Sequence, residues 1–198
     1  RNAIAPWATA PHRWLTFLAH DFGSSAPSVT YWIAESPGEE WEGRYFPRGS
    51  LVVFDELATC KPDRLNEGLG WTVPILSEEI LAMCKQWAIK PVGVADDAIF
   101  ANTGHGAGSI ADEFMRQGVR FLPAKKSDRI SGWQIMRRLL EDAGKPDVPG
   151  LYISRGCEYF WQTVPYLARD AKRIEDLDSS GPDHGADALR YGCLRRDH

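Results

Sequence analysis

The sequence predicts an α/β domain in which a mixed β-sheet carries α-helices on its faces. The first third of the chain alternates strand-forming segments with turns, the middle alternates helices with short buried strands, and the end is helical. This order favours a sheet with both antiparallel and parallel pairs. The 198 residues are 43% hydrophobic and 25% charged, which is enough for one sizeable core. We therefore expect a single domain.

Three strands are expected in the first 60 residues. Residues 14–23 (WLTFLAHDFG) and 28–36 (SVTYWIAES) are rich in β-forming residues and are separated by Gly, Ser and Pro. A third strand, residues 50–59 (SLVVFDELAT), follows an acidic and glycine-rich stretch. The pattern predicts an antiparallel meander with a long or hairpin-like excursion before its third strand.

Helices and strands alternate in the middle of the chain. Apolar residues at helical spacing predict a helix over residues 76–89, with Ser77 as its N-cap. The buried-type strand PVGVA comes next and ends in acids. A second helix is expected between a cap at Ser109 and Gly118, which suits a helix C-terminus. The later elements are a strand at 119–124, an amphipathic helix at 128–144, a short strand at 150–154, a helix at 157–170 bent or split at Pro165, and a final helix from 184.

Acidic residues stand where predicted strands end and where the last helix begins. Asp21 follows the first strand, and Asp96 with Asp97 follows PVGVA. Asp183 and Asp187 are four residues apart and therefore share a helix face. Oxygen ligands of this kind suit Mg²⁺ or Mn²⁺, and two such ions about 4 Å apart can activate water for phosphodiester hydrolysis. The alternative, that these acids only cap helices and turns, stays open.

Several classes of protein are disfavoured by composition. The net charge is −4 and the pI is near 5.7, which argues against a DNA-coating protein. The four cysteines form no CxxC pair, so we expect buried free thiols. Neither a membrane span nor a signal peptide is recognisable, and we expect a cytoplasmic protein. No stretch matches GxxxxGK[ST], so no ATPase is expected in this chain.

Three segments carry a resemblance to a known family. The stretch from GVADDAIF to GWQIMRRLL, the motif DHGADALRYG and the motif HDFGSSAPSV resemble the nuclease part of tailed-phage terminase large subunits. The resemblance extends over roughly residues 14–195. It implies a ribonuclease H-like mixed β-sheet flanked by α-helices. It also implies an endonuclease that uses two Mg²⁺ or Mn²⁺ ions to cut double-stranded DNA concatemers during genome packaging in the host cytoplasm.

The same resemblance assigns roles to individual residues. Asp21 falls on the first catalytic acid and Asp96 on the second, while Asp183 and Asp187 fall on the third motif. His184 is a further candidate metal ligand, and Asp97 competes with Asp96 for its role. The implied partners are double-stranded DNA, an N-terminal ATPase domain of the same polypeptide, the portal protein and the small terminase subunit. We expect an excised nuclease domain, with residues 1–13 as a linker remnant and 14–198 as the core.

Basic residues are the expected DNA contacts. Lys125, Lys126 and Arg129 lie in a strand-to-helix loop, and Arg44 and Arg48 lie among aromatic residues in the excursion. Phosphate contacts of this type give affinity without sequence preference. Two other functions stay open: another ribonuclease H-like nuclease, such as a resolvase or transposase core, and a non-catalytic DNA-binding or docking module of the packaging machine.

Overall fold

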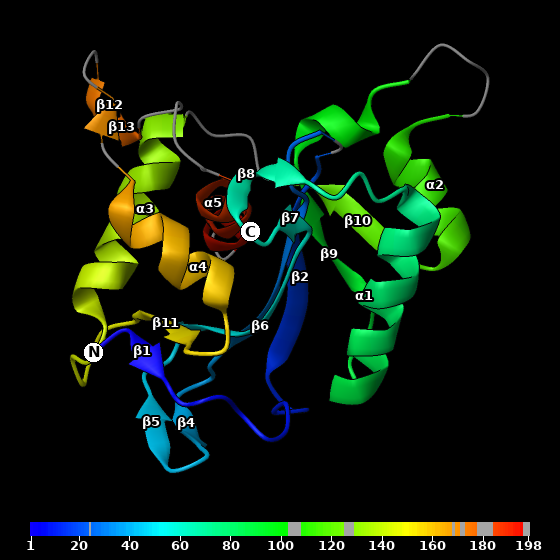
Figure 1. Ribbon diagram of the computed structural model, residues 1–198. Coiled ribbons are helices and arrows are strands. Elements are labelled where there is room, and N and C mark those ends of the chain that lie inside the picture. The colour runs from blue at the N-terminus through cyan, green and yellow to red at the C-terminus, as the bar shows by residue number, and fades with distance from the viewer. Residues whose placement is uncertain are drawn as a thin grey trace.

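The protein forms a central sheet between two helical layers (Figure 1). The computed structural model describes residues 1–23, 25–102, 108–124, 129–167, 169–170, 173–177 and 184–195. Helices α1 (Val73–Trp87) and α2 (Ile110–Gln117) cover one face of the sheet. Helices α3 (Arg129–Asp142), α4 (Glu158–Thr163) and α5 (His184–Arg195) cover the other. The predicted α/β class is confirmed.

The sheet joins seven described strands in the order β1-β11-β6-β3-β2-β9-β10. Their bounds are β1 Ala3–Ile4, β2 Leu15–Asp21, β3 Val29–Glu35, β6 Leu51–Ala58, β9 Val92–Ala95, β10 Arg120–Pro123 and β11 Leu151–Ser154. Strand β3 is antiparallel to β2 and β6, as the predicted meander requires. The other neighbouring pairs in this sheet are parallel. The sheet is therefore mixed.

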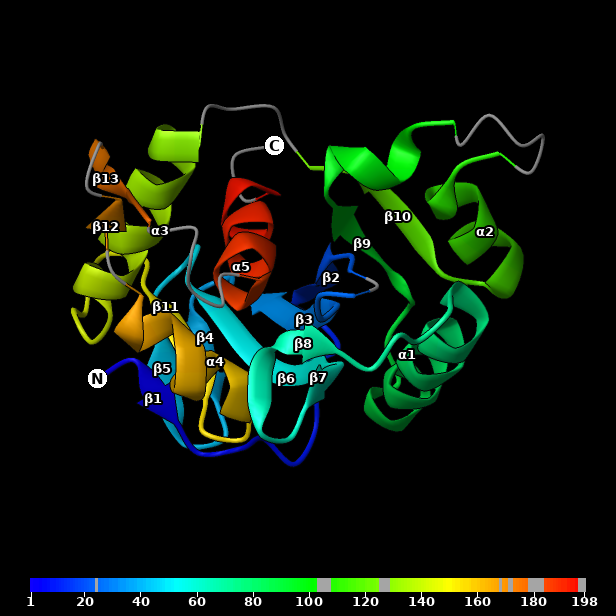
Figure 2. The same cartoon turned by 45° about the horizontal axis from the view of Figure 1, so that its top comes forward.

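Alternation along the strands fills two cores. Successive residues of a strand point to opposite faces, and Trp32 packs towards α1 and α2 while Tyr31 and Ile33 pack towards α3, α4 and α5. On the second face, Trp133 of α3 and Leu189 of α5 are buried. Figure 2 shows α5 between α3 and the strands β2 and β9. The last helix is thus held against the middle of the sheet.

Residues 1–13, interpreted above as a linker remnant, pack against the sheet and against a hairpin. Strand β1 extends the sheet beside β11, and the Trp7 side chain is 7% exposed. The hairpin of β4 (Glu39–Trp41) and β5 (Arg44–Phe46) is the predicted excursion. The Glu42 carboxylate at its tip accepts hydrogen bonds from the backbone N–H groups of Ala8 and Thr9, at 2.9 to 3.1 Å. These contacts fasten the hairpin to the start of the chain.

Some predicted boundaries are confirmed and one is wrong. Ser109 caps α2 in a capping box with Asp112, and Gly118 ends it with φ near 100°. Ser77 does not cap α1, because the helix begins one turn earlier, after Thr72. The cause is Pro74, whose fixed φ suits the first helical turn. Ser77 is instead buried inside the helix.

The region after α4 departs from the expected helix at 157–170. Pro165 lies in the 3-10 turn Val164–Tyr166 that follows α4, so the predicted split at this proline is confirmed. The chain then forms a hairpin of β12 (Arg169–Asp170) and β13 (Arg173–Leu177). A second unpredicted hairpin joins β7 (Cys60–Lys61) to β8 (Arg64–Gly68). No helix in the described parts of the chain is long and apolar enough to cross a membrane.

Candidate metal-binding acidic site

The acids that follow β2 and β9 lie side by side. These two strands are parallel neighbours, with Ala19 opposite Val94 and His20 opposite Ala95. Asp21 and Asp96 are the next residue of each strand. Since Ala19 and Val94 both belong to the core beneath α5, the alternation of the strands directs both carboxylates to the α5 face. The expectation that two acid-terminated strands are adjacent is confirmed.

Asp21 is held in a tight and largely buried position. Its side chain is 9% exposed. The Gly23 N–H donates to the Ser28 hydroxyl at 2.8 Å, and the same hydroxyl donates back to the Gly23 carbonyl at 2.9 Å. A Cβ on Gly23 would lie 2.5 Å from a backbone oxygen, so the turn after Asp21 requires glycine. Nδ1 of His184 lies 3.1 Å from Oδ2 of Asp21, which joins the start of α5 to the end of β2.

Two glycines let α5 lie directly on the sheet. A Cβ on Gly192 would come 2.5 Å from Cδ1 of Ile33 and 3.2 Å from the Cβ of Ala19. A Cβ on Gly185 would come 2.9 Å from the Tyr31 hydroxyl oxygen. Both side chains would push the helix away from β2 and β3. The glycines therefore fix the height at which the first turn of α5 stands above the strand ends.

The buried Tyr191 hydroxyl reports how the acids are arranged. Burial raises the pKa of this hydroxyl above its ordinary value. Negative charge on Asp21, Asp187 and Asp96 raises it further, which places all three carboxylates within electrostatic range of one oxygen. Asp97 is exposed, opens a 3-10 turn and is not among these influences. The geometry therefore favours Asp96 over Asp97.

Two guanidinium groups lie beside Asp187. Nη2 of Arg190 is 3.6 Å from Oδ1 of Asp187, and Nη2 of Arg129 is 3.8 Å from the same atom. Both guanidinium groups also lie over the Trp133 ring, with Cζ at 5.2 Å and 5.8 Å from its centroid. Arg129, expected as a DNA contact, is thus next to an expected metal ligand. The positive charges offset part of the repulsion among the acids.

The other expected site residues are not brought to this place or lie outside the described residues. Asp183, Lys125 and Lys126 belong to the second group. Arg44 and Arg48 belong to the hairpin between β3 and β6, at the opposite strand ends from Asp21. Across the described ranges, no three His, Cys, Asp or Glu side chains form a ready-made metal cluster. Asp183 would have to supplement the acids described here.

Arg44 has a structural environment of its own. Its guanidinium lies over the Tyr152 ring, 4.7 Å from the centroid, and Nη2 donates to the Arg1 carbonyl at 3.3 Å. The seven residues of β3 separate the two ends of the strands by roughly 20 Å. A contact from this hairpin to a substrate at the acids would have to span that distance.

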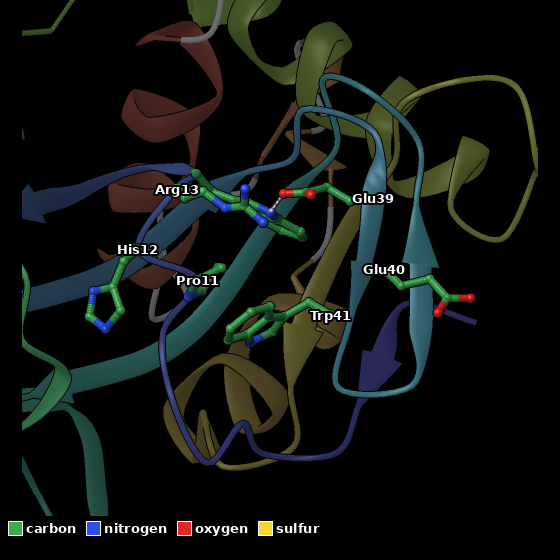
Figure 3. Close-up of a pocket in the computed structure, with 7 residues that line it drawn as sticks. Pro11, His12, Arg13, Glu39, Glu40 and Trp41 are labelled. Carbon is green, nitrogen blue, oxygen red and sulfur yellow. Dashed lines mark hydrogen bonds between the residues drawn. The ribbon is translucent and has the colours of Figure 1, made fainter.

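A hollow of about 270 Å³ lies between the hairpin and the N-terminal segment (Figure 3). Pro11 and Trp41 line it, while Glu40 points away. Its other acid, Glu39, accepts a hydrogen bond from Nε1 of Trp14 at 2.8 Å. With one carboxylate engaged and the other turned outward, the hollow has no converging acids and is not a competing metal site.

Glu56 supports the start of α5 indirectly. Its carboxylate accepts hydrogen bonds from the backbone N–H groups of Tyr159 and Phe160, each at 2.8 Å, and so fixes the beginning of α4. The Tyr31 hydroxyl lies beside this carboxylate. Tyr31 and Tyr159 are the side chains that a Cβ on Gly185 would strike. The sequence indicated an acidic pair here, but it could not show that Glu56 faces α4 and α5.

The pH dependence of stability should reveal Glu56. Burial raises its pKa from 4.5 to about 7, so the folded state favours the protonated form. This contribution is fully present below about pH 4.5 and is lost as the pH rises through about 7. In urea unfolding, we expect wild type to gain at most about 3 kcal/mol relative to Glu56→Gln between pH 8 and pH 5. A pH-independent difference would contradict the assignment.

Comparison with solved structures identifies the fold. No family model and no curated protein matches the sequence. The nuclease domain of the P22 large terminase superposes with a TM-score of 0.68 at 17% identity, over 98% of this chain and 87% of that one. The chain has the fold of a terminase nuclease domain. The predicted ribonuclease H-like architecture is thereby confirmed.

Two further terminases give the same result. The full large terminase of a thermophilic bacteriophage has a TM-score of 0.64 and 14% identity over 97% of this chain. The present chain spans 42% of that protein. The large terminase nuclease of another thermophilic phage, G20c, determined with bound cobalt, has a TM-score of 0.54 and 13% identity, over 96% of this chain and 91% of that one. At such identities the comparison establishes the fold.

Proposed function

We propose that this chain is a metal-dependent endonuclease that cuts double-stranded phage DNA concatemers during genome packaging in the host cytoplasm. The observation that carries the proposal is the convergence of Asp21, Asp96 and Asp187 around the Tyr191 hydroxyl, at the ends of β2 and β9 and the start of α5. The fold shared with large terminase nuclease domains supports it.

The donor set fits a divalent cation. Carboxylate oxygens are the ligands that Mg²⁺ and Mn²⁺ prefer, and His184 adds an imidazole beside Asp21. G20c nuclease structures with bound cobalt or zinc support a divalent ion in this fold. We propose that Asp21, Asp96, Asp183 and Asp187 hold two Mg²⁺ or Mn²⁺ ions. When bound, such ions supply activation of the attacking water and stabilisation of the leaving oxygen.

The remaining residues hold this arrangement in place. His184 fixes the rotation of the Asp21 carboxylate through its 3.1 Å contact. Arg129 is 36% exposed at its side chain, so it can reach a DNA phosphate as well as Asp187. Lys125 and Lys126 precede Arg129 and are proposed to extend the phosphate contacts. Such contacts explain affinity for DNA without sequence preference.

The proposed partners follow from the larger proteins that share this fold. The chain spans 42% of the full large terminase described above, and structures of that terminase include complexes with ADP and ATP-γ-S. We propose that an ATPase domain on the same polypeptide moves DNA and presents it to the acids. The portal protein and the small terminase subunit are proposed to complete the machine.

Cleavage of supercoiled plasmid at low salt tests the proposal. Reactions contain Mn²⁺, Mg²⁺, Ca²⁺ or EDTA, and nicked and linear products are quantified on gels. We expect cutting with Mn²⁺ or Mg²⁺ and none with EDTA. Cutting that persists in EDTA would contradict a metal-dependent reaction, and no cutting by folded protein under any condition would favour a docking module.

Gly185→Ala should separate activity from folding. The new Cβ would sit 2.9 Å from the Tyr31 hydroxyl oxygen and 3.3 Å from the Tyr159 ring, so the first turn of α5 must move. A displacement of about 1 Å at His184 can reduce the cleavage rate about 100-fold. The test compares initial cleavage rates and melting temperatures of variant and wild type. A full cleavage rate would show that the height of α5 above the sheet does not matter.

A further inference from the structure

Arg190 is a nearly buried cation beside the acidic site. It lies three residues after Asp187 on α5, and its side chain is 11% exposed. Its guanidinium carbon lies 4.7 Å from the centroid of the Tyr191 ring and 5.2 Å from that of Trp133. Planar stacking of this kind is a property of arginine that lysine does not share. The side chain is therefore held in one orientation.

Helix α3 provides a place shaped for this side chain. Gly132 faces α5, and a Cβ there would come 2.9 Å from Cδ and 3.0 Å from Cγ of Arg190. Leu194 would be 3.6 Å away, at an ordinary contact distance. The next residue of α3 is Trp133, which contributes one of the two stacking rings. The absence of a side chain at Gly132 thus makes room for the Arg190 stem.

Fold stability alone does not account for a buried guanidinium. Removing a charge from water is costly, and a well-packed apolar residue is often at least as stable in such a place. Arg190 faces Asp187 at 3.6 Å, beyond ordinary hydrogen-bond length, and its Nε has no hydrogen-bond partner in the described part of the protein. Its position beside converging carboxylates offers a better reason.

We propose that Arg190 is a positioning residue for the acidic site. It holds Asp187 on the inner face of α5 and offsets part of the negative charge that Asp21 and Asp96 add nearby. Gly132 and Trp133 keep it there. This inference rests on the proposed function, because it assigns Arg190 to the arrangement of the proposed metal ligands.

Mn²⁺ binding without DNA tests the inference. Isothermal titration calorimetry with MnCl₂ is performed on the 198-residue chain. Loss of a group that orients a metal ligand typically costs 10- to 100-fold, and we expect about that loss of Mn²⁺ affinity for Arg190→Gln. Arg190→Lys should recover part of it, since charge remains without the planar stacking. Arg138→Gln, at an exposed position on α3, removes the same charge and should bind Mn²⁺ as wild type does.

Gly132→Ala guards against a trivial loss of folding. Alanine favours a helix over glycine, so the melting temperature should not fall by this route, while the new Cβ displaces Arg190. We expect weaker Mn²⁺ binding from a well-folded Gly132→Ala protein, with a smaller loss than for Arg190→Gln. If Arg190→Gln fails to fold, this variant decides: unchanged affinity in Gly132→Ala overturns the inference.

The outcomes separate the inference from the proposed function. If wild type binds Mn²⁺ and cuts DNA while Arg190→Gln binds Mn²⁺ equally well or more tightly, Arg190 is not a positioning residue and the nuclease proposal stands. If wild type neither binds Mn²⁺ nor cuts DNA, both proposals fall. A graded loss from Arg190→Lys to Arg190→Gln, with Arg138→Gln unchanged, supports the inference.

Discussion

Asp21→Asn is expected to abolish plasmid cleavage while leaving the fold intact. The substitution keeps the shape of the side chain and its contact with His184 but removes the charge that a divalent ion needs. We expect the cleavage rate to fall at least about 1000-fold, which corresponds to about 4 kcal/mol of transition-state stabilisation. The melting temperature should be unchanged or higher, because repulsion from Asp96 and Asp187 is relieved.

Asp97→Asn is the matched control for this experiment. Asp97 adjoins Asp96 but is exposed, at the start of a 3-10 turn. We expect it to retain the wild-type cleavage rate, while Asp96→Asn loses it. Equal activity in Asp21→Asn and wild type would mean that the acids only cap structural elements, and loss in Asp97→Asn would exchange the roles of the two neighbours.

Gly93→Ala is expected to have the largest effect on stability. Gly93 lies opposite Leu18 where β9 pairs with β2. A Cβ there would be 2.0 Å from the Leu18 carbonyl oxygen and 2.5 Å from its carbonyl carbon. Because backbone atoms cannot yield as a flexible side chain can, the two strands must separate. We expect a loss of about 4 kcal/mol or more in the free energy of unfolding, measured in urea.

Gly156→Ala serves as its control. A Cβ at Gly156 would meet Oγ of Ser154 at 3.4 Å and a Pro6 ring carbon at 3.8 Å, which are ordinary contacts. We expect a change within about 1 kcal/mol. If Gly93→Ala were as mild as Gly156→Ala, the close pairing of β2 and β9, and with it the adjacency of Asp21 and Asp96, would be contradicted.

The sequence predicted long elements well because their patterns are local. Strands β2, β3 and β6 have enough β-forming residues to be recognised singly, and Ser109 with Gly118 marks both ends of α2. Strand β1 and the hairpins β7–β8 and β12–β13 were missed. They contain two to five residues each and form through pairing with a partner strand, so no periodicity announces them.

The acids of the site could be predicted, but their supports could not. Asp21 and Asp96 follow strands that a βαβ order brings together, and Asp187 stands one turn inside a helix. The role of Arg190 depends on Gly132 and Trp133 of another helix, a contact that no spacing in the sequence encodes. A basic residue three positions after Asp187 was the available signal, and it is also typical of an ordinary surface ion pair.

Anomalous X-ray scattering from crystals soaked in MnCl₂ tests the central claim most directly. The account expects a Mn²⁺ peak bounded by the carboxylates of Asp21 and Asp96 and the first turn of α5, with metal–oxygen distances of about 2.2 Å. The peak should be absent from Asp21→Asn crystals. A peak elsewhere, or unchanged occupancy in Asp21→Asn, would contradict the assignment of these acids as the metal site.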